Sequence, residues 1–173
     1  VPITIAVLVG LFMVQRHGTG RIGGVFGWIM LIWFLAIGIA GAVAIADNPW
    51  VLRATNPYFG AHFLVDHGWH GFLMLGLVFL AVTGAEALYA DLGHFGRRPI
   101  QTAWLVIALP ALTINYFGQG ALILATPAAA SNPFFLSAPD WALYPLIGLA
   151  LLAALIASQA VIAGAFSVTR QGM

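Results

Sequence analysis

Charged side chains are scarce in this sequence of 173 residues. They make up 6% of it, and 62% of the residues are hydrophobic, whereas a soluble domain usually carries about 25% charged residues. Lysine and cysteine are absent, and the lack of cysteine excludes disulfides and thiolate metal sites. A net charge of +1 gives no electrostatic basis for binding nucleic acid. So few charges cannot cover a water-facing surface, and the composition therefore indicates a membrane protein.

Long apolar runs account for most of the chain. We predict membrane helices at 2–14, 22–46, 71–90, 100–124 and 141–168. The last four each provide the roughly 20 residues that a spanning helix needs. The first run is shorter, so we expect the chain to be an internal part of a longer membrane protein. Alternating segments of about 10 residues, which a transmembrane barrel requires, are not present. The predicted fold is an all-α, polytopic transmembrane helical bundle, with 1–173 as a single domain.

The arginines predict the orientation of these helices by the positive-inside rule. If five helices cross the membrane in turn, the first, third and fifth end on the same side. Five arginines directly follow these three spans: Arg16, Arg21, Arg97, Arg98 and Arg170. Arg53 is the only arginine in the connections 47–70 and 125–140. We therefore predict that both connections are extracytoplasmic and that the protein is a multi-pass protein of the cell (inner) membrane.

Both outside connections differ in composition from flexible linkers. Residues 49–70 are rich in aromatic side chains, which suits the headgroup level of a membrane and predicts short interfacial helices. In 125–140, the dipeptides Asn132-Pro133 and Ala138-Pro139 indicate turns.

Three histidines, His62, His67 and His70, lie in the first connection. Their spacing matches no standard metal signature. We interpret them as interfacial residues, and we expect no metal site there and no resident cofactor.

Glu86 is a carboxylate inside a predicted span. Inserting it costs at least about 2.5 kcal/mol, so such a residue usually faces a cavity, a partner or an ion. Thr83 shares its helix face, being three residues away, and Gly84 between them weakens the helix and can free backbone carbonyls. Together these groups form a set of hard oxygen ligands of the kind that an alkali cation prefers. The alternative is a Glu86 held by hydrogen bonds, with Thr83 bonding back to its own helix.

Further polar residues lie in the fourth and fifth predicted spans. Asn115 and Gln119 are one helical turn apart, with Tyr116 between them, and Ser158 lies in a run of small residues. Interhelical hydrogen bonding or packing is one role for such side chains in lipid, and lining a permeation path is the other. No second membrane acid, paired histidine or activated nucleophile accompanies Glu86, so we predict that the protein is not an enzyme.

Several segments resemble the signature of the Kup/HAK/KT potassium uptake permeases. The matching runs, in order, are 83–96, 115–121, 132–135, 139–143 and 157–162. The resemblance covers nearly the whole chain. It implies part of a transporter of the amino acid–polyamine–organocation type, which has two inverted five-helix repeats, and this chain would match about spans four to eight.

The resemblance also implies function and site residues. Family members take up potassium, in many bacterial cases coupled to protons. The resemblance places Thr83 in potassium coordination and Glu86 in transport or coupling, and we predict Gly84 and Tyr89 as further residues of this site. It also implies that other ligands come from the missing first, third and tenth spans. The expected partners are the potassium ion, the proton, the bilayer, the remaining spans of the permease and, as one option, a second copy in a homodimer. From the residues alone, a transporter of an amino acid or another organic substrate remains the alternative.

Overall fold

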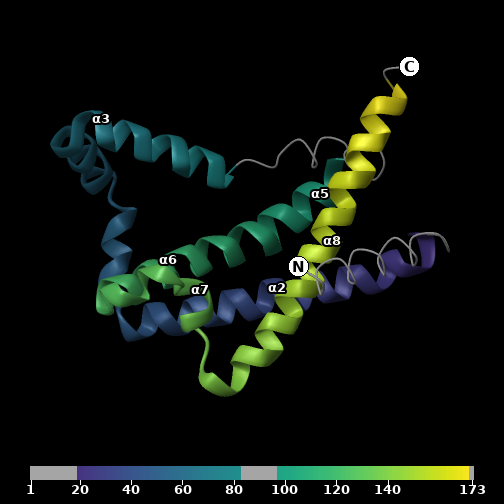
Figure 1. Ribbon diagram of the computed structural model, residues 1–173, viewed down its shortest axis with the longest axis horizontal. Coiled ribbons are helices and arrows are strands. Elements are labelled where there is room, and N and C mark those ends of the chain that lie inside the picture. The colour runs from purple at the N-terminus through teal and green to yellow at the C-terminus, as the bar shows by residue number, and fades with distance from the viewer. Residues whose placement is uncertain (1–18, 83–96, 172–173) are drawn as a thin grey trace.

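All secondary structure in the described part of this computed structural model, residues 19–82 and 97–171, is helical (Figure 1). The longest helices are α2 (Thr19–Asp47), α3 (Pro57–Val82), α6 (Leu109–Ala125) and α8 (Asp140–Gln171). No strand occurs in these residues, and the predicted all-α class is confirmed.

Three described helical stretches are long and apolar enough to cross a membrane. They are Phe26–Asp47, Arg97–Ala125 and Asp140–Ile162. Few of their residues are buried against other parts of the chain. A helix that is apolar on all faces is either deep in a core or surrounded by lipid. The large exposed apolar side chains are therefore those of a protein solvated by lipid.

The pair α2 and α6 forms the centre of the described fold (Figure 1). Contacts advance together along both helices: Gly38 faces Ala111, Gly41 faces Asn115 and Gly118, and Asn48 bonds to the carbonyl of Ala121. The two helices are therefore parallel. Two parallel membrane helices require an odd number of crossings in the chain that joins them.

The α6 helix continues a longer element. It follows α5 (Arg97–Ala103) and the π-helical turn η2 (Trp104–Ala108) without a break. In this turn the N–H of Leu109 donates to the carbonyl of Trp104. Pro110 follows directly and has no N–H of its own. The wide turn thus lies at the point where a proline interrupts the regular hydrogen bonds of the helix.

Short helices connect the long ones on the side where α2 and α6 end. They are η1 (Pro49–Thr55), η3 (Pro127–Ser131) and α7 (Pro133–Leu136). The prediction of short helices in 49–70 agrees with η1. A second helical stretch begins at Pro57 and ends at a kink at Gly68, where φ is 47° and ψ is −118°, so α3 consists of two helices, 57–67 and 69–82. The stretch 57–67 also agrees with the predicted short helices. That conformation is accessible essentially to glycine alone, so Gly68 allows the kink that separates the two helices of α3.

Candidate functional site

The residues with the strongest sequence case for ion binding lie outside the described residues. These are Thr83, Gly84, Glu86 and Tyr89. The described chain reaches this segment through α3, which ends at Val82, and resumes with α5 at Arg97. Their role therefore remains a prediction from the sequence.

Asn115 is the most buried polar residue of the described site candidates, with 6% of its surface exposed. It lies on the face of α6 that packs against Gly41 of α2. No partner for its side-chain amide lies among the described residues. Among the described residues, the Asn115 amide is thus left without a partner beside a tight helix contact.

The neighbours of Asn115 in sequence lie differently. Gln119 is one turn further along α6 and half-buried, so the predicted shared face with Asn115 exists. Tyr116 is 56% exposed and does not belong to the buried α2–α6 contact. The described chain therefore combines Asn115 and Gln119 but leaves Tyr116 apart from them.

Ser158 lies in α8, which packs mainly against α2 and α7, whereas α6 packs mainly against α2. Ser158 itself is half-buried. No substantial packing joins α6 and α8 in the described residues. The structure does not bring Ser158 and Asn115 into one cluster through these helices.

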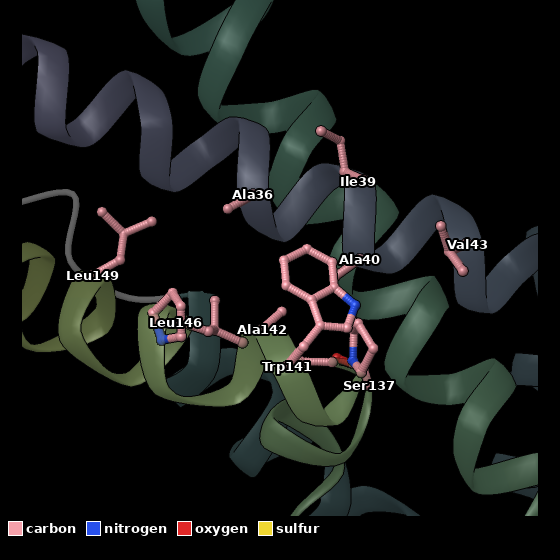
Figure 2. A pocket seen from close by; sticks show the side chains of 12 residues that line it. Ala36, Ile39, Ala40, Val43, Ser137, Trp141, Ala142, Leu146 and Leu149 are labelled. Carbon is pink, nitrogen blue, oxygen red and sulfur yellow. The ribbon is translucent and has the colours of Figure 1, made fainter.

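An apolar groove of about 360 Å³ lies between α2 and the beginning of α8 (Figure 2). The α2 side contributes Ala36, Ile39, Ala40 and Val43. The indole of Trp141 lies across the groove in Figure 2 and is 81% exposed. Its lining holds no charged side chain, so the groove suits an apolar side chain or acyl chain rather than an ion.

The histidines of the first connection do not converge. His62 pairs through Nδ1 with a carboxylate oxygen of Asp66 at 2.6 Å. His67 stacks on Phe63, with ring centroids 4.3 Å apart. Within residues 19–82 and 97–171 no cluster of three metal-ligating side chains occurs. The contacts of these residues are local, within one turn of α3.

Comparison with known families identifies the type of protein. The family model for the K+ potassium transporter integral membrane domain matches residues 1–173. The chain belongs to this family. The sequence resemblance to potassium uptake permeases is thereby confirmed, and the family is one of transporters.

Individual relatives agree with the family. Over its full length the chain is 62% identical to a probable potassium transport system protein Kup 1 of Dechloromonas aromatica, covering 28% of that protein. It is 61% identical to a probable Kup protein of Pseudomonas putida, with 100% of the chain aligned to 27% of the relative. The chain thus spans little more than a quarter of the relatives it matches. No solved structure matches it.

Sequence reasoning missed the features that hold this part of the family fold together. The backbone contact between Gly41 and Gly118 and the hydrogen bond from Asn48 to Ala121 were not predicted. A signal exists for the first: glycines and alanines recur on one side of α2 and of α6, as they do where membrane helices approach closely.

Proposed function

We propose that this chain is the part of a potassium uptake permease that provides the end of its first repeat and the first three helices of its second, and that the permease couples potassium entry to protons. The observation that carries the proposal is the match of the potassium transporter family over all 173 residues. The relatives are named as potassium transport system proteins. The protein would act in the cell membrane, with the potassium ion and the proton as its cargo.

The packing of α2 and α6 supports the proposed topology. Because these helices are parallel, the intervening chain must cross the membrane an odd number of times. The predicted span 71–90 supplies one crossing. It contains Thr83 and Glu86, which we propose as the ion-binding and coupling residues, with Gly84 and Tyr89 beside them.

A path through the membrane also needs polar groups that an ion can meet after losing water. Asn115 is suited to this because its amide is nearly buried and has no partner among the described residues. We include Gln119, Tyr116 and Ser158 as further lining residues, in contact with spans that this chain does not contain. Asparagine and glutamine carbonyl oxygens are ligands for hard cations.

Growth complementation tests the proposed cargo. The full-length permease that contains this chain should rescue a host lacking potassium uptake on low-potassium medium, and uptake of potassium should acidify the interior of reconstituted vesicles. A permease that fails to rescue growth but accumulates an amino acid would contradict potassium as cargo. Potassium uptake without proton movement would retain the cargo and reject the coupling.

A further inference from the structure

Arg53 differs from the other arginines because it is the only one in the two predicted extracytoplasmic connections. It therefore contributes nothing to the predicted positive-inside orientation. The transport function proposed above gives it no role either. The surroundings of Arg53 in η1 indicate a role for it.

The η1 helix is fixed rigidly at the ends of two membrane helices. Asn48, just before it, donates from Nδ2 to the carbonyl oxygen of Ala121 in α6 at 3.2 Å. Val51 is 5% exposed, and its Cγ2 atom lies against Gly120, 3.3 Å from where a β-carbon would stand. One face of η1 is thus held on α6, and the opposite face is left outward at the level where the apolar stretch Phe26–Asp47 ends.

Trp50 and Arg53 share an exposed face of η1. Residues three apart in a 3₁₀-helix lie above one another, and the guanidinium carbon of Arg53 lies over the Trp50 ring, 3.3 Å from its centroid. Trp50 is 60% exposed. A guanidinium over a ring retains N–H groups that can donate to an oxyanion in a fork geometry. The indole therefore holds the cation in place without neutralising it.

No anion compensates this cation in the described chain. The one ion pair formed by the side chains of the described residues joins His62 and Asp66, and Arg53 makes no ion pair with a described carboxylate. Leu52 and Phe59, on either side of it in sequence, are exposed apolar side chains. Such a surface suits a ligand that carries a negative charge and apolar chains.

We propose that Trp50 and Arg53 form a binding site for the phosphate of an anionic phospholipid at the extracytoplasmic surface of the membrane. The guanidinium would donate to the phosphate oxygens, the indole would lie at the headgroup level, and acyl chains would run along the apolar surface of α2. Trp and Tyr favour this level of a bilayer, and one arginine near the surface favours an anionic over a zwitterionic lipid by about fivefold.

The test uses the full-length permease, purified and delipidated, with thermal unfolding as the readout. Added phosphatidylglycerol should raise the melting temperature of the wild type more than phosphatidylcholine does, and Arg53→Gln should remove this difference. Arg53→Lys should retain part of it, because the charge remains without the stacked fork. Arg97→Gln, on the opposite side of the membrane in the predicted topology, is the control and should leave this Arg53-dependent difference in place.

The outcomes separate the lipid from other anions. Equal stabilisation of wild type and Arg53→Gln by phosphatidylglycerol would overturn the site. So would stabilisation by inorganic phosphate equal to that by the lipid. If Arg53→Gln lowers the melting temperature equally in every lipid, Arg53 pairs with a carboxylate elsewhere in the permease and the lipid proposal is wrong. Should Arg53→Gln not fold, Trp50→Leu provides the same comparison, because loss of the ring should weaken the lipid preference.

Discussion

Gly41 of α2 and Gly118 of α6 meet backbone to backbone. A β-carbon added to Gly41 would lie 2.5 Å from the carbonyl oxygen of Ile114, and one added to Gly118 would lie 2.6 Å from the carbonyl oxygen of Gly41. In lipid the hydrophobic effect does not drive helices together, so close van der Waals packing must do so. The two glycines allow α2 and α6 to approach closely enough for that packing.

Alanine at either glycine should therefore separate the helices. We expect Gly41→Ala and Gly118→Ala to destabilise the full-length permease by about 1–3 kcal/mol, the usual cost of overpacking, because the atoms that clash are backbone and cannot rotate away. Thermal unfolding followed by size-exclusion chromatography measures this. Gly148→Ala is the matched control, since nothing lies within 4 Å of a β-carbon there. A wild-type melting temperature for both variants would contradict the contact.

The bend of α3 at Gly68 gives a second prediction. A side chain at φ 47°, ψ −118° is strained by about 1–3 kcal/mol, so Gly68→Ala should straighten or destabilise α3. Gly60→Ala, in the same helix and with open space around it, should be neutral or slightly stabilising because alanine favours helix. Thermal unfolding of both variants compares them. Equal stability of the two would show that the bend is not required.

The link between α2 and α6 at their ends is tested by Asn48→Asp. This change keeps the shape of the side chain but removes the Nδ2 donor to Ala121. Because the carboxylate also faces the carbonyl oxygen of Ala121, we expect a loss of at least about 0.5–1.5 kcal/mol, the net value of one hydrogen bond, measured by thermal unfolding. Thr55→Ala removes a local, exposed bond to Leu52 and should cost less. A larger effect for Thr55 than for Asn48 would argue against the link.

The comparison of sequence and structure shows what each type of pattern encodes. The helices follow from the apolar runs, because hydrocarbon forces every backbone group to bond within its own helix. The choice of neighbours does not follow, because α2 is apolar on all sides and no face is marked by polarity as inward. Small residues recur on one side of each helix, but they do not reveal that α2 pairs with α6 through Gly41 and Gly118, which only the placed helices show.

For the candidate site, too, the sequence predicts some features and leaves others open. Polarity within an apolar run was enough to select Asn115 and Ser158 as candidates. Burial and neighbourhood were not predictable, since they depend on which helix covers which face. The structure accordingly buries Asn115 against α2, while Ser158 is half-buried on α8, which has no substantial contact with α6 in the described residues. The bend at Gly68 was equally hidden, because a glycine in a helical run does not reveal its backbone angles.

A substitution at Asn115 distinguishes a role in helix packing from a role in contacting the ion. Asn115→Leu keeps the number and branching of the side-chain heavy atoms and, because the amide has no described partner, should change the stability of the permease little. We expect potassium uptake at low external potassium to fall about tenfold, as the loss of one polar contact worth roughly 1.4 kcal/mol would require. Thr113→Val, an exposed polar position on the same helix, is the control. Normal uptake by Asn115→Leu would remove the residue from the path.

Glu86 is the decisive residue for the proposed mechanism, since it is the one charge within the predicted spans that the topology does not explain. Glu86→Gln retains the size and hydrogen-bonding capacity of the side chain but can neither balance a cation nor carry a proton. We expect it to abolish potassium uptake or to uncouple uptake from proton movement in vesicles that hold the full-length permease. Asp91→Asn, at the predicted cytoplasmic end, should retain coupled uptake. Thr83→Val should weaken potassium affinity without changing the coupling, because the hydroxyl is a neutral ligand. Proton-coupled uptake at the wild-type rate by Glu86→Gln would exclude this carboxylate from both roles and leave the charge of the ion to be balanced by residues of other spans.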